Sequence, residues 1–118
     1  MAEDDEYLRN LNQSVLEEYG YRVIVARDGE EAVRLFRDNK DAVRMVVLDV
    51  IMPKKNGKDA YDEIVKTAPA VKVLFTSGYT ADFVSMKGIK EPGRFFLPKP
   101  ASPTALLLKV REVLDFKP

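Results

Sequence analysis

The segment Met45–Leu48 is an unbroken run of apolar residues that ends in the carboxylate of Asp49. A strand with one face in water alternates apolar and polar residues, so a solid apolar run indicates a strand buried on both faces. Such a strand belongs to a sheet that helices cover on both sides. A carboxylate that ends a buried strand is costly without partners, so Asp49 is a candidate for a capping or functional role.

Strands and helices alternate along the rest of the chain. Short apolar or β-branched runs predict three further strands, at Tyr21–Ala26, Val71–Thr76 and Arg94–Leu97. Apolar residues at three- and four-residue steps predict helices over Tyr7–Tyr19, after Asp28, over Ala60–Ala68, around Ala81–Lys87 and after Ser102. This alternation predicts right-handed crossovers and a doubly wound parallel sheet, an α/β fold in which functional groups gather beyond the carboxyl ends of the strands.

Composition narrows the class of protein. At 118 residues, without repeats or linker-like runs, the chain is expected to form one domain spanning residues 1–118. The formal net charge is zero, so no positive excess attracts nucleic acid or an anionic membrane. There is no signal peptide, apolar span or cysteine, which predicts a cytoplasmic protein without membrane contact. The absence of His removes the usual base and metal ligand.

Acidic and basic residues at the predicted strand ends form a candidate site. Glu3 and Asp4 precede the first helix, Asp49 and Ser77 follow strands, and Lys99 lies between two prolines after the last strand. Carboxylates brought together repel unless a cation neutralises them, and without His or Cys the hard cation Mg²⁺ is the preferred candidate. The Lys99–Pro100 bond is a candidate cis peptide.

Each of these residues also has a structural explanation. Acidic residues before a helix are ordinarily caps, and for Glu3 and Asp4 considered alone this explanation is favoured. Ser77-Gly78 could form a plain turn, and a single lysine such as Lys99 is usually a solvated surface charge. Phe96 fits a core position of the last strand better than a functional one. The placement of these residues together at one edge of the sheet favours function.

Taken together, the motifs resemble the receiver domains of bacterial two-component signalling. The motifs that carry the resemblance are Glu3-Asp4, Val47–Pro53, Asn56-Gly57, Thr76–Thr80 and Leu97–Pro100. Order and spacing both match, and the resemblance covers nearly the whole chain. The run Phe75–Asp82 looks most like receivers at the C-terminus of hybrid histidine kinases.

The resemblance implies a flavodoxin-like sheet in the order 2-1-3-4-5 and a role for each site residue. Asp49 would accept a phosphoryl group from a phosphohistidine on a histidine kinase or phosphotransfer domain. Mg²⁺ would be held by Glu3, Asp4, Asp49 and the backbone carbonyl of Ile51. Ser77 and Lys99 would bind phosphoryl oxygens, and Ser77 with Phe96 would switch the surface formed by the fourth helix, last strand and last helix. Such a domain promotes its own phosphorylation and dephosphorylation and is not otherwise an enzyme.

Two departures from the family pattern carry expectations of their own. The usual first strand is reduced to Met1-Ala2, and because that strand is central, its loss predicts two unpaired edges and a groove in the core. A trimmed fragment, a shifted segment or an exchange between chains would explain this. Ala101 stands where many relatives carry an aromatic residue, which is expected to change packing rather than chemistry.

Two other functions compete with the phosphoacceptor. The first is a receiver-like interaction module that never takes up phosphate. The reduced first strand makes this function plausible. A small flavodoxin-like cofactor binder is the second, and the absence of a Gly-rich phosphate loop disfavours it. The stimulus, the output partner and the oligomeric state leave no mark in the sequence.

Overall fold

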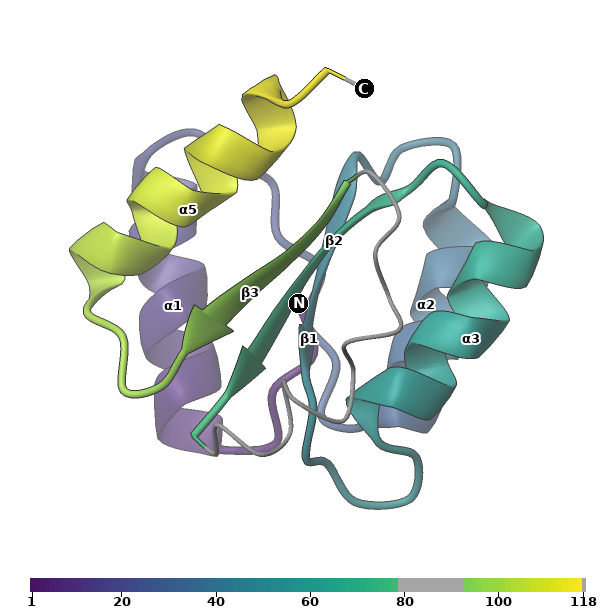
Figure 1. The fold of residues 1–118 in the computed structure, drawn as a ribbon. Coiled ribbons are helices and arrows are strands. Elements are labelled where there is room, and N and C mark those ends of the chain that lie inside the picture. Colours follow the sequence, from purple (N-terminus) through teal and green to yellow (C-terminus); the bar gives the residue numbers. More distant parts are fainter. Residues whose placement is uncertain (79–92, 118) are drawn as a thin grey trace.

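The computed structural model describes residues 1–78 and 93–117, and within these it contains a parallel sheet flanked by helices (Figure 1). The strands are β1 (Met45–Asp49), β2 (Lys72–Ser77) and β3 (Arg94–Pro98). The helices are α1 (Glu6–Glu18), α2 (Gly29–Asn39), α3 (Gly57–Thr67) and α5 (Pro103–Asp115). The helix predicted around Ala81–Lys87 lies outside the described residues.

Two helices begin directly after Asp28 and Ser102, where the sequence predicted helices, and the side chains of these residues cap them. Asp28 accepts a hydrogen bond from the Glu31 amide at 2.9 Å to start α2, and Ser102 accepts one from Ala105 at 3.1 Å to start α5. Helix α3 begins earlier than predicted, because Asn56 caps it by accepting from the Asp59 amide at 2.9 Å. Gly20, with φ of +93°, follows the end of α1.

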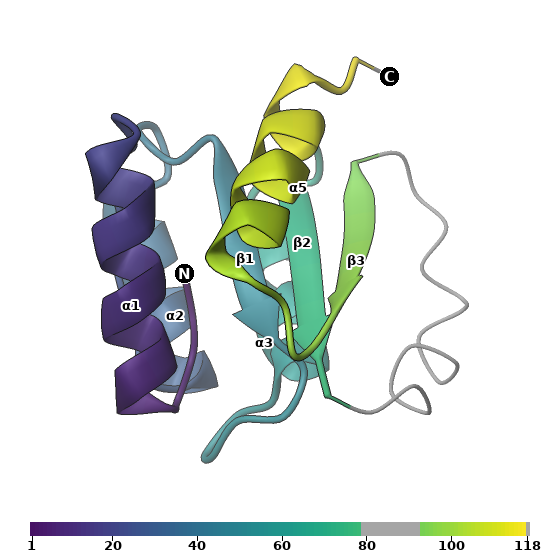
Figure 2. The ribbon, with the colours of Figure 1, turned by 90° about the vertical axis from the view of Figure 1, so that its left-hand side faces the viewer.

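Both faces of the sheet are covered, as the solid apolar run of β1 predicted. Helices α2 and α3 lie on one face, and α1 and α5 lie on the other (Figures 1 and 2). Val46 and Leu48 pack in the cluster that includes α2 and α3, whereas Val47 packs in the cluster that includes α1 and α5. The three strands are parallel in the order β1–β2–β3, with Leu48 opposite Phe75 and Phe75 opposite Phe96.

The predicted strand Tyr21–Ala26 is wrong: within this segment only Ala26 forms a bridge, to Ala2. Ala2 also bridges Leu48, so it lies between Ala26 and β1. A segment becomes a strand only where a neighbouring strand offers hydrogen-bond partners. The N-terminal stub, residues 1–3, is too short to offer them beyond Ala26. The predicted order 2-1-3-4-5 nevertheless survives in outline, with Ala26, Ala2, β1, β2 and β3 side by side.

The short stub is held from both sides. The Ala2 amide donates to the Val47 carbonyl at 2.8 Å, and the Glu3 amide donates to the Ala26 carbonyl at 3.0 Å. These bonds close the two edges only opposite residues 1–3. A cavity of about 40 Å³ remains between Met1 and its neighbours on the α2 side, and one of about 300 Å³ lies on the α1 and α5 side.

The larger cavity lies where the sequence predicted a groove, and Ala101 is one of the residues that line it. Leu8, Val47, Leu97, Leu106 and Ala101 contribute to its walls. The cavity agrees with the expected groove beside the short first strand, and Ala101 lies on its wall. The Lys99–Pro100 peptide bond before it is cis, as the sequence indicated. No helix in residues 1–78 or 93–117 has the length and apolar character needed to cross a membrane.

In the isolated polypeptide of residues 1–118, the ammonium group on Met1 is expected to make the free energy of unfolding depend on pH. It donates to the Ile24 carbonyl at 2.7 Å, and burial lowers its pKa from 8.0 to about 6. Between pH 6 and 8 the unfolded chain therefore binds more protons, so the free energy of unfolding should rise with pH and level off above pH 8. Because Met1 is only partly buried, we expect a rise on the order of 1 kcal/mol.

Denaturant unfolding at several pH values in buffer with a metal chelator measures this rise. The chain contains no His, so no side chain with an ordinary pKa titrates in the same window. A polypeptide acetylated at its N-terminus is the control and should show no slope between pH 6 and 8. An equal slope in the acetylated chain would assign the effect to another group.

Candidate functional site

The carboxyl edge of the sheet gathers the residues that the sequence singled out. Asp49 ends β1, Ser77 ends β2, and Lys99 directly follows β3. Because the strands are parallel, their carboxyl ends meet at one edge. Backbone bonds fix them there, since the Asp49 amide donates to Ala2 at 3.1 Å and the Lys99 amide donates to the Ser77 carbonyl at 2.7 Å.

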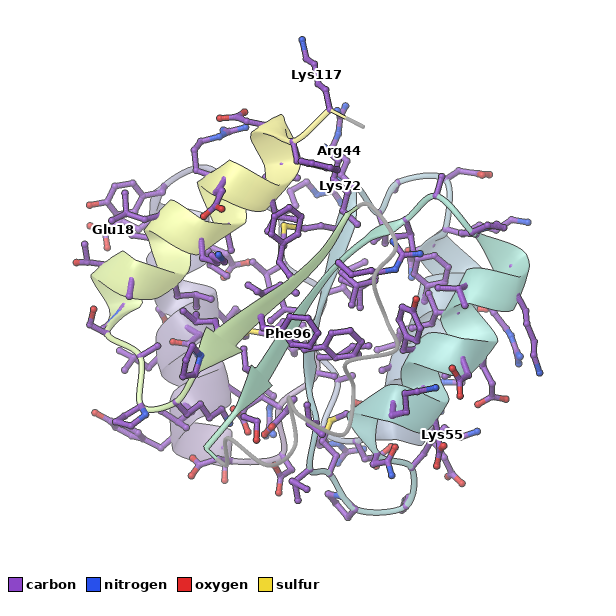
Figure 3. All side chains as sticks on the ribbon, viewed as in Figure 1. Glu18, Arg44, Lys55, Lys72, Phe96 and Lys117 are labelled. Atoms are coloured by element: carbon purple, nitrogen blue, oxygen red, sulfur yellow. The ribbon has the colours of Figure 1, made fainter. Side chains whose placement is uncertain are left out.

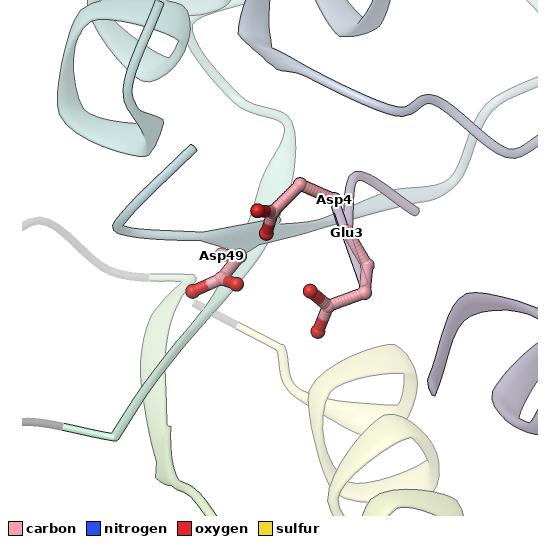
Figure 4. A group of neighbouring side chains, drawn as sticks. All are labelled: Glu3, Asp4 and Asp49. Atoms are coloured by element: carbon pink, nitrogen blue, oxygen red, sulfur yellow. The ribbon is translucent and has the colours of Figure 1, made fainter. Parts of the chain in front are cut away.

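Three carboxylates share this edge (Figure 4). Glu3, Asp4 and Asp49 each offer an oxygen, and these oxygens lie within 4.8 Å of one another. The exposed fraction is only 4% for Glu3 and 6% for Asp49, while Asp4 is exposed. Asp5, which accepts from the Leu8 amide at 3.0 Å, is the residue that caps α1. The capping explanation for Glu3 and Asp4 is therefore wrong.

Lys99 is the cation that the structure places among these carboxylates. Its Nζ donates to Asp49 Oδ2 at 2.8 Å and to Glu3 Oε1 at 2.5 Å. Burial alone would lower the pKa of Lys99, but the hydrogen bonds and charges of Asp49 and Glu3 outweigh it and raise the pKa above the usual value. Lys99 is therefore not a solvated surface charge.

The residues of this edge fit a hard divalent cation. Three carboxylates face one ammonium group, so negative charge remains uncompensated among the described side chains. Their donor atoms are all oxygens, the ligands that Mg²⁺ prefers. The ammonium of Lys99 already bonds two of the three carboxylates as a cation would. Ile51 lies two residues beyond Asp49 in the loop before α3, with its side chain 54% exposed.

Ser77 and Phe96 lie on neighbouring strands. Ser77 is 1% exposed and belongs to β2, so the plain-turn interpretation is wrong for this residue. The ring of Phe96 stacks on that of Phe75, with centroids 5.5 Å apart, and Phe75 contacts Tyr61 at 5.3 Å. Phe96 is half-buried against the core, as its strand position predicted (Figure 3).

One residue of this edge had no signal in the sequence. Arg9, in the first turns of α1, donates through its Nη1 to the backbone carbonyls of Glu3 at 2.9 Å and Asp4 at 3.4 Å. It thereby holds the acidic pair from the helix side. A basic residue at this spacing is common on exposed helix faces, so only the folded structure distinguishes its role.

Comparisons with known proteins agree on one family. A family model described as the response regulator receiver domain matches residues 1–111. The chain is 35% identical over 115 residues to the transcriptional regulatory protein CpxR of Klebsiella pneumoniae subsp. pneumoniae (strain HS11286), covering 97% of this chain and 47% of that protein. It is 34% identical over 116 residues to the sensor kinase CckA of Brucella abortus (strain 2308), covering 98% of this chain and 12% of that protein.

Solved structures give the same result. A response regulator receiver domain protein from Clostridium thermocellum matches with a TM-score of 0.86 at 26% identity, over 97% of this chain and 90% of that one. The receiver domain of the hybrid histidine kinase CckA matches with a TM-score of 0.82 at 30% identity, over 97% and 95%. The chain thus spans less than half the length of the two curated relatives but nearly all of these solved domains.

Proposed function

The chain belongs to the response regulator receiver domain family, and on this premise we propose that Asp49 accepts a phosphoryl group from a phosphohistidine on a histidine kinase or phosphotransfer domain. The observation that carries the proposal is the pairing of Asp49 with Lys99 at 2.8 Å inside the acidic cluster. This arrangement combines a nucleophilic oxygen with a fixed positive charge.

The proposed reaction uses only groups that are already in the correct state. An ionised Asp49 oxygen attacks the phosphorus, the phosphorus–nitrogen bond breaks, and its electron pair stays with the imidazole of the donor. No base is needed, because a carboxylate nucleophile, unlike a hydroxyl or a thiol, has no proton to give up when it attacks. The product is a mixed anhydride on Asp49.

Each neighbour then has a defined task toward the phosphoryl oxygens. Lys99 pairs with one of them through its ammonium group, and the Ser77 hydroxyl donates a hydrogen bond to another. Glu3, Asp4, Asp49 and the Ile51 carbonyl are the residues that would hold Mg²⁺. When bound, Mg²⁺ supplies positive charge that offsets the negative charge of the phosphoryl group.

Phosphorylation would also change the contacts of the switch residues. Moving the Ser77 hydroxyl toward the phosphoryl group vacates space into which Phe96 could turn from its stack on Phe75. The surface that would respond comprises β3, α5 and the predicted fourth helix. A protein partner would read this surface.

We further propose that residues 1–118 form a single receiver domain of a hybrid sensor histidine kinase. The likeness to CckA, at 34% identity in the curated protein and 30% in the solved domain, supports this choice. In such a protein the phosphodonor would reside in the same polypeptide or in a phosphotransfer partner.

Mass spectrometry with acetyl phosphate as the donor tests the phosphoacceptor function. With Mg²⁺ present, the wild-type chain should gain the mass of one phosphoryl group, and a chelator should abolish the gain until Mg²⁺ is restored. Hydroxylamine should remove the adduct, because an acyl phosphate is labile to it and a phosphoserine is not. Beryllofluoride with Mg²⁺ should change the spectrum of the chain.

The same experiment separates the phosphoacceptor from its rival. A chain that gains no mass and does not respond to beryllofluoride would be a receiver-like interaction module. A gain that resists hydroxylamine would place the phosphoryl group on a hydroxyl side chain and would contradict the role of Asp49.

A further inference from the structure

The loop from Val50 to Asn56 connects Asp49 to α3 and includes the Ile51 carbonyl. Its two ends are joined, because the Gly57 amide donates to the Val50 carbonyl at 2.9 Å. At its tip the Lys55 amide donates to the Pro53 carbonyl at 2.7 Å, and Lys54 adopts a left-handed φ of +65°. The loop therefore has a defined shape. The part of the protein that the loop contacts then fixes the position of the Ile51 carbonyl relative to Asp49.

The loop rests on the first residue of α2. A Cβ atom on Gly29 would lie 1.9 Å from the Lys55 carbonyl oxygen and 2.6 Å from the Lys55 carbonyl carbon. Real atoms do not approach so closely, so any side chain at this position forces the loop or α2 to move by roughly 1 Å. Gly29 has an ordinary φ, so close approach rather than backbone conformation is what requires glycine here.

Ion pairs accompany this contact but cannot replace it. Lys54 Nζ lies 3.8 Å from Asp28 Oδ2, and Lys55, which is labelled in Figure 3, pairs with Glu63 of α3. Glu63 in turn lies 3.9 Å from Arg37 of α2. Long charged side chains can follow a moving loop, whereas the contact between Gly29 and the Lys55 carbonyl is backbone against backbone. Gly29 is thus the rigid part of the connection.

We infer that Gly29 is a positioning residue for the cation site, because its missing side chain lets α2 set the loop that carries the Ile51 carbonyl beside Asp49. The inference rests on the proposed function, in which Ile51 and Asp49 hold Mg²⁺ together. It adds a residue of α2 that contacts neither the cation nor the phosphoryl group.

The test compares two glycine substitutions in the full chain. Gly29→Ala should weaken Mg²⁺ binding, measured by calorimetric titration, by about tenfold, the size of effect that supporting residues have on metal affinity. Gly20→Ala is the matched control, because Gly20 has a φ of +93° and no atom lies within 4 Å of the place that an alanine Cβ would occupy there. It strains the backbone far from the site and should leave Mg²⁺ affinity unchanged.

A kinetic comparison distinguishes positioning from general loss of structure. At low Mg²⁺ the rate of phosphorylation by acetyl phosphate should fall in Gly29→Ala, and at saturating Mg²⁺ it should return to the wild-type rate. Because bound Mg²⁺ also stabilises the folded chain, circular dichroism should measure the folded fraction at each Mg²⁺ concentration, and the rate per folded molecule of a merely destabilised chain would equal that of the wild type throughout. Equal Mg²⁺ affinity in Gly29→Ala and wild type would overturn the inference.

A second variant covers the case in which Gly29→Ala does not fold. Adding Lys55→Gly removes the Lys55 Cβ, which lies 2.8 Å from the new side-chain position, and gives the backbone there the freedom of glycine, so that the loop can move away from the methyl group while the contact with the Lys55 carbonyl stays displaced. The double variant should fold but keep weak Mg²⁺ binding, and wild-type affinity in it would overturn the inference. A wild-type chain that binds Mg²⁺ but takes up no phosphoryl group would overturn only the proposed function. The Mg²⁺ affinities of the wild type and Gly29→Ala would still decide the role of Gly29.

Discussion

Asp49→Asn should take up no phosphoryl group from acetyl phosphate and should not respond to beryllofluoride. An amide oxygen carries no negative charge and cannot form the mixed anhydride, so the loss should be complete rather than partial. Asp49 is 6% exposed, and Lys99 keeps its bond to Glu3 after the substitution. We therefore expect the free energy of unfolding to change by about 1 kcal/mol or less.

Asp59→Asn provides the matched control for this loss. Asp59 carries the same side chain in the exposed first turn of α3, away from the acidic cluster. It should gain one phosphoryl group at the wild-type rate, as mass spectrometry can measure. Uptake of phosphate by Asp49→Asn that matches Asp59→Asn would show that another residue is the acceptor.

Local signals predicted the elements that position this site. The solid run before Asp49, the β-branched and aromatic runs before Ser77 and Lys99, and the caps at Asp28 and Ser102 all act over a few residues. Parallel pairing then brings the strand ends together without further information. For this reason the positions of Asp49, Ser77 and Lys99 could be predicted from the sequence alone.

Features that depend on distant partners could not be predicted in the same way. Tyr21–Ala26 has the composition of a strand, but it forms none, and only Ala26 bridges the N-terminal residues, at Ala2. The contact of Gly29 with Lys55 joins segments far apart in the chain, and nothing around either residue indicates it. Arg9 is similar, since its bonds to Glu3 and Asp4 depend on how the chain turns into α1.

Lys99→Ala should have opposite effects on metal binding and on phosphorylation. In the metal-free chain Lys99 bonds both Asp49 and Glu3, so a divalent cation must compete with it for these carboxylates. Removing the lysine should therefore tighten Mg²⁺ binding by about tenfold, which corresponds to about 1.4 kcal/mol. The rate of phosphorylation should nevertheless fall on the order of 100-fold, because the phosphoryl oxygens lose a preorganised positive charge.

Three measurements and one control decide this prediction. Calorimetric titration gives Mg²⁺ affinity, and mass spectrometry with acetyl phosphate at saturating Mg²⁺ gives the rate. Lys58→Ala removes a lysine that pairs with Asp62 on α3, and it should change neither quantity. Because the carboxylates of Lys99→Ala repel without a cation, its melting temperature should rise more with Mg²⁺ than that of the wild type. If Lys99→Ala instead unfolds with no separate functional loss, Lys99 is a structural residue. A purely structural residue cannot produce the expected combination of tighter Mg²⁺ binding and slower phosphorylation.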